Sequence, residues 1–314
     1  MTQERRIAVV DLGTNSTRLL IAELSEAGAV ETLVRRSEVT RLGDGVDASG
    51  RLSDAAIERV YDVLATYREL ADEHGVADSI AVATSAVRDA ENGPELQDAV
   101  RERFGFDIRI ISGGEEARLT FLGATSGRDD SAPTLVVDIG GGSTEYVIGT
   151  PGSQPDFHVS THLGSVRQSE RHLASDPPER HETDALRAAA RDIIAEGVPA
   201  KRRREVRAGI AVAGTATQLA SIDQALEPYE PARVEGYDLM LDDCERMLAM
   251  LASLSLAERK QVAGMHPDRA ATIVAGAAIL IESMRAFGLE HVEVSEADIL
   301  HGAALEALAQ GGGG

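Results

Sequence analysis

The chain has 314 residues, which is too long for one ordinary core and about right for two domains of average size. A hydrophobic content of 43% with only 3% aromatic residues is typical of a globular protein with an aliphatic core and excludes a disordered chain. The formal net charge of −21 argues against nucleic acid or an anionic membrane as a partner, because both are bound through basic surfaces.

No apolar run approaches the ~20 residues that a membrane-spanning helix requires, and the first residues, MTQERRIAVV, lack the apolar core of a signal peptide. We therefore expect a cytoplasmic protein. The single cysteine, Cys244, excludes an internal disulfide and a thiolate metal cluster. We expect it to pack inside a helix.

The first part of the chain predicts three strands followed by alternating helices and strands. Apolar runs at residues 7–10 and 19–24 flank a turn-prone stretch and predict a hairpin, and residues 28–42 contain a third strand. A Ser/Asp cap and apolar residues at helical spacing predict a helix from Ser53 to near Gly75. The expected order then continues with a strand at 79–84, a helix at 94–105, a strand at 107–111 and a helix at 114–124.

The same order restarts in the second part of the chain. Three strands are expected at 134–138, 143–149 and 156–161, then helices at 166–174 and 183–197 and a strand at 209–214. Helices at 215–226, 244–254 and 268–288, a strand at 291–295 and a helix at 298–310 complete it. We therefore expect two α/β domains, residues 1–125 and 126–314, with the last helix free to pack back on the first domain.

One short motif occurs at the same place in both parts. AVVDLGTNSTRLLIAEL begins at Ala8 and VVDIGGGSTEYVIG begins at Val136, and each places an Asp, a turn and Ser-Thr between two apolar runs. Asp-Gly turns are common in unrelated hairpins, so the motif alone does not establish a repeat. Its position in two matching halves nevertheless indicates a duplicated domain.

The glycine turn of the second motif predicts an anion site. Gly140, Gly141 and Gly142 carry no side chains, so consecutive N–H groups can point into one space, and Ser143 adds a hydroxyl donor. A phosphate group suits such a turn. Asp138 would repel that phosphate unless a divalent cation lay between them, and carboxylate and phosphate oxygens suit Mg²⁺.

The first motif places Gly13, Thr14, Asn15 and Ser16 in the equivalent turn and predicts a second phosphate-facing site. Two such turns, one in each domain, predict a site in the cleft between the domains. No GxxxxGK[ST] sequence occurs, and no GxGxxG follows a strand, so P-loop and dinucleotide-binding folds lack their motifs.

Six segments resemble, in this order, the exopolyphosphatase / guanosine pentaphosphate phosphatase (Ppx/GppA) family: DLGTNSTRLLI, ATSAVRDAENG, ISGGEEARLTFLGA, VVDIGGGSTEYVIG, THLGSVRQSER and GIAVAGTATQLA. The resemblance runs from about Ile7 to beyond Leu305. It implies two RNase H-like domains of the actin-like ATPase / sugar kinase superfold with an interdomain cleft. It also implies a divalent cation, Mg²⁺ or Mn²⁺.

The resemblance also implies roles for residues at matching positions. Glu116 stands where the family has its proposed general base, and Arg88 stands where the family binds the phosphate chain. Asp138 and Glu145 stand where the family holds its metal ion, and Arg269 matches the arginine of the family's long second-domain helix and is a local group that can attract substrate.

Without the family, each of these residues has an ordinary structural interpretation. Glu115 and Glu116 are both favourable at a helix start, where carboxylates interact well with the helix dipole. Arg88 is compatible with a surface charge and Glu145 with a solvent-facing strand position. The residues alone therefore do not separate Glu115 from Glu116 as a base.

We expect an exopolyphosphatase that hydrolyses the terminal phosphate of inorganic polyphosphate, with guanosine pentaphosphate as the alternative substrate. A kinase of the same superfold and a sensor that binds without turnover are two further candidate functions. The GGEEARL segment disfavours the kinase, and the intact set of Arg88, Glu116, Asp138 and Glu145 disfavours the sensor. The assembly state stays open, and a homodimer is one candidate.

Substrate length is a separate expectation. The net charge of −21 repels a long polyanion, and salt screening confines attraction to local groups within ~8 Å. Longer family members also continue beyond the point where this chain ends. Both considerations predict a preference for short oligophosphates.

Overall fold

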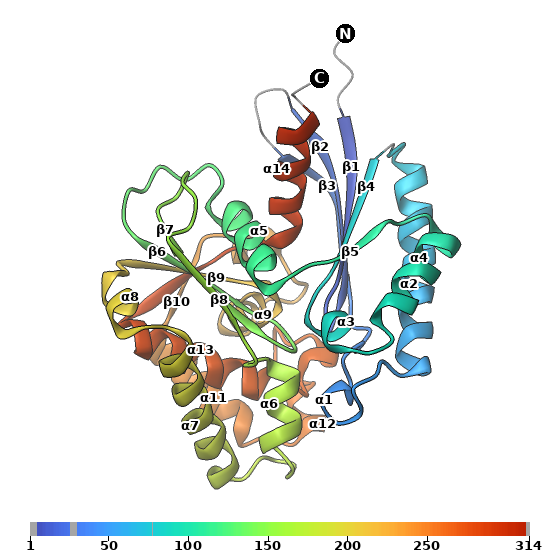
Figure 1. Cartoon of the computed structure of the whole chain (residues 1–314). Coiled ribbons are helices and arrows are strands. Elements are labelled where there is room, and N and C mark those ends of the chain that lie inside the picture. The colour runs from blue at the N-terminus through green and yellow to red at the C-terminus, as the bar shows by residue number, and fades with distance from the viewer. Residues whose placement is uncertain (1–4, 26–29, 77, 312–314) are drawn as a thin grey trace. The chain divides into compact units, whose positions relative to one another are not determined.

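The computed structural model describes residues 5–25, 30–76 and 78–311. They form two compact α/β units, of which the first contains Met1–Gly123 with Ala297–Gly314 and the second contains Ala124–Glu296 (Figure 1). The sequence analysis placed the boundary after residue 125, whereas the chain leaves the first unit after Gly123 and returns to it at Ala297. The outer ends of both predicted domains and the start of the third predicted strand lie outside the described residues.

The first unit is built on a five-stranded sheet with the order β3-β2-β1-β4-β5. Its strands are β1 (Arg5–Leu12), β2 (Thr17–Leu24), β3 (Val30–Glu38), β4 (Asp78–Ala83) and β5 (Ile108–Ile110). Strands β1 to β3 run antiparallel to one another, and β4 and β5 run parallel to β1. This order and these directions are those of the RNase H-like fold that the family resemblance implied.

Helices cover both faces of this sheet, so that β1 is buried on both sides. The helices of the first unit are α1 (Val46–Ser49), α2 (Asp54–Glu73), α3 (Ser85–Asp89), α4 (Gly93–Phe104), α5 (Gly113–Thr125) and α14 (Ile299–Gly311). Ala8 and Val10 pack into a core with α2 and α4, whereas Ile7 and Val9 pack into a core with α5 and α14. The continuous apolar run of β1 follows from this two-sided burial.

The second unit repeats the first sheet and adds one strand. Its sheet has six strands in the order β10-β11-β9-β6-β7-β8. They are β6 (Thr134–Ile139), β7 (Thr144–Gly149), β8 (Phe157–Thr161), β9 (Ala208–Val212), β10 (Tyr237–Met240) and β11 (His291–Val294). In the order β8-β7-β6-β9-β11 they correspond to β3-β2-β1-β4-β5. The sequence analysis did not predict β10, whose four residues are too few for a recognisable alternation.

The helices of the second unit surround α13, which is buried along almost its whole length. They are α6 (Ser165–His172), α7 (Arg180–Gly197), α8 (Ala200–Glu205), α9 (Ala213–Asp223), α10 (Pro231–Val234), α11 (Leu241–Ala252), α12 (Leu256–Arg259) and α13 (Ile273–Phe287). The prediction that the long helix begins at residue 268 is wrong, because Pro267 opens a separate 3-10 turn that ends at Arg269. Arg269 therefore lies outside α13.

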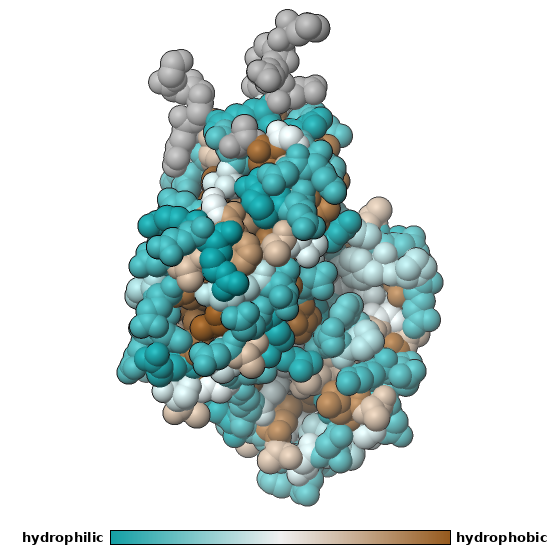
Figure 2. Space-filling model, turned by 90° about the vertical axis from the view of Figure 1, so that its right-hand side faces the viewer, coloured by the Kyte–Doolittle hydropathy of each residue, from teal (hydrophilic) through white to brown (hydrophobic). Residues whose placement is uncertain are grey.

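Cys244 lies buried in α11, as predicted. Among the described residues, no helix is both long enough and apolar enough to cross a membrane. The face shown in Figure 2 is mostly hydrophilic and is interrupted only by small hydrophobic areas.

Candidate active site

In the glycine turn between β6 and β7, the carbonyl oxygens point toward helix α6. The carbonyl oxygens of Gly140, Gly141 and Gly142 accept hydrogen bonds of 2.8 to 3.1 Å from the first turn of α6. The donors are the backbone N–H groups of Ser165, Val166 and Arg167 and the Nε atom of Arg167. A trans peptide points its C=O and N–H in opposite directions, so the N–H groups of Gly141, Gly142 and Ser143 point away from α6. Three successive N–H groups on one side form a backbone cradle for an anion.

Helix α6 can approach the turn this closely because residue 164 is a glycine. A Cβ atom at Gly164 would lie 2.2 Å from the carbonyl oxygen of Gly141. The first N–H groups of α6 are thus used to hold the turn. The requirement for glycine at this position follows from close packing, and the orientation of the cradle depends on it.

Two buried carboxylates lie next to this cradle. Asp138 near the end of β6 is directly opposite Glu145 in β7, and the two residues are 6% and 1% exposed. Opposed residues of antiparallel strands share one face of the sheet, with Cβ atoms about 5 Å apart. Ser160 Oγ donates to Glu145 Oε1 at 2.7 Å and helps to fix that side chain. Like charges at directly opposed positions of a strand pair are unfavourable, and a cation shared by the two carboxylates would relieve this.

The pair Asp138 and Glu145 fits a cation that takes only part of its coordination from protein. Among the residues that the structure describes, no group of three or more His, Cys, Asp and Glu side chains could hold a metal ion. Mg²⁺ is commonly bound by one or two carboxylates, with water and substrate phosphate completing its octahedral shell. A buried carboxylate pair beside an anion cradle supplies that donor set.

Arg269 lies at the same edge of the second sheet. Its guanidinium rests on Gly214, where a Cβ atom would lie 1.8 Å from Nη1. Gly214 belongs to the start of α9, which follows β9, the neighbour of β6 in the sheet. Thr215 Oγ1 donates to the carbonyl oxygen of Ile139 at 3.2 Å and ties α9 to the end of β6. The 3-10 turn therefore brings Arg269 to the strand ends that carry the glycine turn.

The turn of the first unit has the same backbone geometry. The N–H of Gly13 donates to the carbonyl oxygen of Ser16 at 3.0 Å, and the N–H of Gly140 donates to that of Ser143 at 3.0 Å. The same hydrogen bond thus closes both hairpins.

In the first turn, the carbonyl oxygens of Thr14 and Asn15 both point toward the loop that contains Arg41 and Gly43. Thr14 accepts a hydrogen bond from the N–H of Gly43 at 2.8 Å, and Asn15 accepts one from the N–H of Arg41 at 2.9 Å. The N–H groups of Asn15 and Ser16 therefore point away from that loop. The buried Ser16 Oγ makes no hydrogen bond to the described residues. A turn of this kind can take up a phosphate group through two N–H groups and a hydroxyl.

Glu116 and Arg88, the two predicted catalytic residues, lie in contact within the first unit. Arg88 Nη1 donates to Glu116 Oε2 at 3.1 Å and to the carbonyl oxygen of Ile111 at 3.0 Å. Glu116 lies in the first turn of α5 and is 7% exposed. Glu115 instead lies 3.5 Å from Arg109 and is more exposed. The fold thus gives these neighbouring carboxylates different surroundings, which the sequence alone did not separate.

The Ppx/GppA phosphatase family profile matches residues 20–310 of this chain. A curated relative, exopolyphosphatase 2 of Mycobacterium tuberculosis, is 36% identical over 318 aligned positions, covering 96% of this chain and 98% of the relative. The chain belongs to the Ppx/GppA phosphatase family. This membership makes the protein a phosphoanhydride hydrolase and confirms the family resemblance seen in the sequence.

Solved structures give the same result for the fold. An exopolyphosphatase from Cytophaga hutchinsonii matches with a TM-score of 0.89 and 28% identity, covering 98% of each chain. The Ppx/GppA family member from Aquifex aeolicus matches with a TM-score of 0.83 and 28% identity, covering 99% of each chain. The predicted fold class is therefore confirmed.

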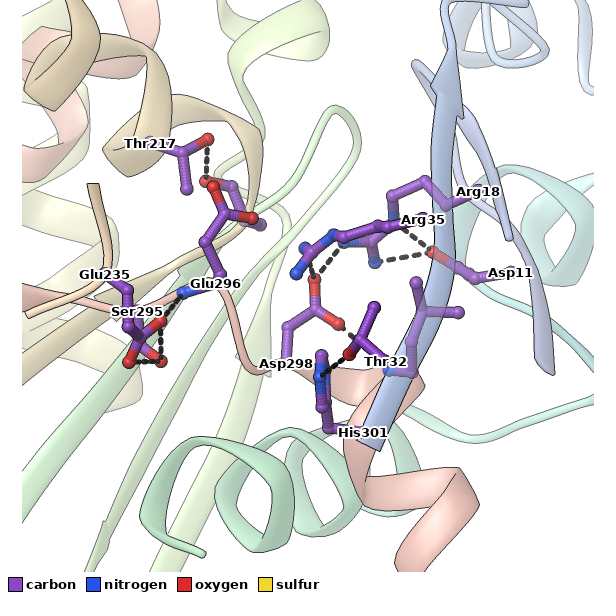
Figure 3. Close-up of polar contacts among 12 residues, drawn as sticks. Asp11, Arg18, Thr32, Arg35, Thr217, Glu235, Ser295, Glu296, Asp298 and His301 are labelled. Carbon is purple, nitrogen blue, oxygen red and sulfur yellow. Dashed lines mark hydrogen bonds and ion pairs between the residues drawn. The ribbon is translucent and has the colours of Figure 1, made fainter. Parts of the chain in front are cut away.

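The sequence analysis missed the residues that surround Asp11, the counterpart of Asp138. Asp11 is 2% exposed, and Arg18, directly opposite it in β2, donates to its Oδ2 atom through Nε at 2.9 Å and Nη2 at 2.6 Å. Arg18 also donates to Asp298, which comes just before α14, and Arg35 Nη2 lies 3.2 Å from the same Asp298 oxygen (Figure 3). The repeat itself carried the signal, since it aligns Arg18 with Glu145.

Burial favours a higher pKa for both Asp11 and Asp298, but the resulting pKa is raised only for Asp11 and is lowered for Asp298. Burial raises the pKa of Asp11 above its ordinary value, although Arg18 opposes the shift. Burial would also raise the pKa of Asp298, but the charges of Arg18, Arg35 and His301 together hold that pKa below its ordinary value. The pKa values of the two carboxylates differ in direction because Asp298 has Arg35 and His301 beside it in addition to Arg18.

Proposed function

We propose that the protein is an exopolyphosphatase that removes the terminal phosphate of inorganic polyphosphate by attack of water. The observation that carries the proposal is the backbone cradle of Gly141, Gly142 and Ser143 beside the buried carboxylates Asp138 and Glu145. A phosphate site next to a cation site is what stabilises the charge that develops during phosphoryl transfer. The family membership and the similarity to named exopolyphosphatases support the same activity.

In the proposed reaction, Glu116 accepts the proton of the attacking water while the water oxygen bonds to the terminal phosphorus. The bond between that phosphorus and the bridging oxygen breaks, which leaves orthophosphate and a chain shorter by one phosphate. Arg88 moves part of its hydrogen bonding from Glu116 to the phosphate chain. This exchange weakens the ion pair between Arg88 and Glu116, so that the Glu116 carboxylate can take the proton when substrate is bound.

Each unit has its own groups that are suited to bind phosphate. In the second unit, the N–H groups after Gly140 and the guanidinium of Arg269 bind phosphate oxygens. In the first unit, the turn that contains Gly13, Thr14, Asn15 and Ser16 binds a further phosphate. A divalent cation, Mg²⁺ or Mn²⁺, held by Asp138 and Glu145, supplies positive charge to the phosphate oxygens.

Short chains are the proposed preferred substrates. The protein carries a net charge of −21, so a long polyanion gains little from long-range attraction. Local groups such as Arg88 and Arg269 act only within about a Debye length, roughly 8 Å at physiological salt. Guanosine pentaphosphate ends in the same kind of phosphoanhydride and is the alternative substrate.

Phosphate release tests the proposal directly. We expect Mg²⁺-dependent release from short polyphosphate, slower release per chain end from long polyphosphate, and little release from ATP. Glu116→Gln protein, purified in parallel, controls for contaminating phosphatases. Faster release from guanosine pentaphosphate than from every polyphosphate would overturn the substrate assignment, and equal rates with a chelator present would overturn the cation requirement.

Gel analysis of a partly digested long polyphosphate tests the mode of release. Weak long-range attraction predicts that each chain dissociates after few cleavages, so a ladder of intermediate lengths should accumulate. Full-length chains that coexist only with orthophosphate would contradict the proposed preference, because that pattern requires processive digestion.

A further inference from the structure

The hairpins β1–β2 and β6–β7 each have an aspartate in their first strand. The residue that faces this aspartate from the second strand is positively charged in one hairpin and negatively charged in the other. In the second unit, Asp138 is opposed by Glu145, a second carboxylate. In the first unit, Asp11 is opposed by Arg18, a cation that the chain itself supplies. The residue that follows Ser-Thr in each motif, Arg18 or Glu145, faces the aspartate across the strand pair and so sets the local charge.

Arg18 joins two buried carboxylates of the first unit. Its Nη2 atom lies 2.6 Å from Asp11 Oδ2, and its Nη1 atom donates to Asp298 Oδ2. Asp11 and Asp298 are 2% and 0% exposed, so neither charge is well solvated. Figure 3 shows the Arg18 and Arg35 side chains meeting the Asp298 carboxylate, with Asp11 on the other side of Arg18. One guanidinium thus lies between two carboxylate oxygens, where a divalent cation would otherwise be favoured.

We propose that Arg18 is a built-in counter-ion that takes the place of a divalent cation in the first unit. The chain consequently binds its catalytic cation only in the hairpin of the second unit. Arg18 also fixes the Asp11 side chain at the end of β1, next to the turn that begins at Gly13. This inference rests on the proposed function, because that function assigns the cation to Asp138 and Glu145.

Charge balance supports the assignment. Asp11 and Asp298 bring two negative charges, and Arg18 and Arg35 bring two positive charges. Without Arg18, Asp11 loses the guanidinium that pairs with it, while Asp298 keeps its contact with Arg35. A buried carboxylate pair with a net negative charge is a donor set that attracts a divalent cation.

The test is the number of Mn²⁺ ions bound per chain, measured by calorimetry and by the electron paramagnetic resonance of free Mn²⁺. Arg18→Ala should bind one ion more than the wild type, and this ion should raise the melting temperature of the variant. Arg18→Lys keeps the charge and should bind the wild-type number. Asp11→Asn combined with Arg18→Ala removes both charges and should also return to the wild-type number.

Arg6→Ala is the matched control on the same hairpin. Arg6 is opposite Glu23 in the same strand pair, and its Nε atom donates to Glu23 Oε2 at 3.1 Å. Among the described residues Arg6 contacts a single carboxylate, that of Glu23, so its removal leaves one carboxylate and not a pair, and no additional ion should bind.

An unchanged Mn²⁺ number in folded Arg18→Ala protein would overturn the inference. So would a variant that unfolds in metal-free buffer and is not restored by Mn²⁺, whereas restoration by Mn²⁺ would support it. The outcome is separate from that of the proposed function, because ion counting needs no turnover. If wild-type protein fails to hydrolyse polyphosphate while Arg18→Ala still gains an ion, the proposed function fails alone.

Discussion

The hairpins β1–β2 and β6–β7 have one backbone design and two different chemistries. Both close with the same hydrogen bond, from Gly13 to Ser16 and from Gly140 to Ser143, and both tie the carbonyl oxygens of the turn to one side. The residue opposite the aspartate differs, being Arg18 in the first hairpin and Glu145 in the second. We therefore propose that the backbone binds an anion in both hairpins, and that the side chain opposite the aspartate determines whether the positive charge beside it is an arginine or a bound cation.

On this proposal, the two copies of the domain have different functions although they share one fold. The sheets keep their strand order, and the turns keep their length and their hydrogen bonds. A change from carboxylate to guanidinium at one strand position reverses the local charge, because the side chains of opposed residues lie close together. The predictions below test each part of this comparison.

The largest expected effect is the difference in turnover between Asp138→Asn and Asp11→Asn. Loss of the Asp138 charge removes part of the proposed cation site, and we expect turnover to fall about 10⁴-fold, which corresponds to several kcal/mol of transition-state stabilisation. Asp11 is paired with Arg18, so Asp11→Asn should lower turnover by less than about tenfold. Steady-state rates at a series of Mg²⁺ concentrations decide the matter. Equal losses in the two variants would break the comparison.

Glu116→Gln tests whether a carboxylate that is paired with an arginine can still act as a general base. Glu116 is paired with Arg88, as Asp11 is with Arg18, yet it is the proposed base. Turnover should fall about 10³-fold, within the usual range for a positioned general base, while substrate affinity changes little. Glu115→Gln is the matched control and should keep nearly the full rate, since Glu115 lies toward Arg109. If Glu115→Gln is the impaired variant, the assignment of the base is wrong.

Gly164→Ala and Gly43→Ala compare the supports of the two turns. A Cβ atom at Gly164 meets the backbone of Gly141 at 2.2 Å, whereas one at Gly43 meets the Cγ2 atom of Thr14 at 2.2 Å. Backbone atoms of a packed turn yield less easily than a methyl group, so Gly164→Ala should distort its turn more. We expect about a tenfold rise in KM for Gly164→Ala and a smaller rise for Gly43→Ala. The reverse order would mean that the first turn dominates substrate binding.

The sequence predicted the features that depend on local patterns. Apolar runs around Asp-Gly turns predicted both hairpins, and the turn glycines predicted the cradle at Gly141. The pattern could not predict which side of the turn its N–H groups occupy, since that depends on hydrogen bonds from α6, more than twenty residues further along.

Contacts between distant segments explain what the sequence analysis missed. Asp298 meets Arg18 only because the chain returns to the first unit at Ala297. Arg269 leaves the helical pattern because Pro267 opens its own turn, and its place on Gly214 depends on the absence of a side chain there. Likewise, Glu115 and Glu116 are adjacent on one helix, so only their packing partners distinguish them.

The smallest expected effect concerns the different charged surroundings of Asp298 and Asp11. The pKa of Asp298 lies below its ordinary value of 3.8, so its ionised form stabilises the fold at neutral pH, and this stability is lost as the pH falls below 3.8. Asp298→Asn should therefore reduce the free energy of unfolding by about 2 kcal/mol at pH 7, and the difference from wild type should shrink as the pH falls. The pKa of Asp11 is raised, so its ionisation costs stability as the pH rises above 3.8, and the difference for Asp11→Asn should grow in favour of wild type on acidification. Urea unfolding from pH 7 to well below pH 3.8 measures both trends, and parallel pH dependences in the two variants would show that the pKa values of the two carboxylates are shifted in the same direction.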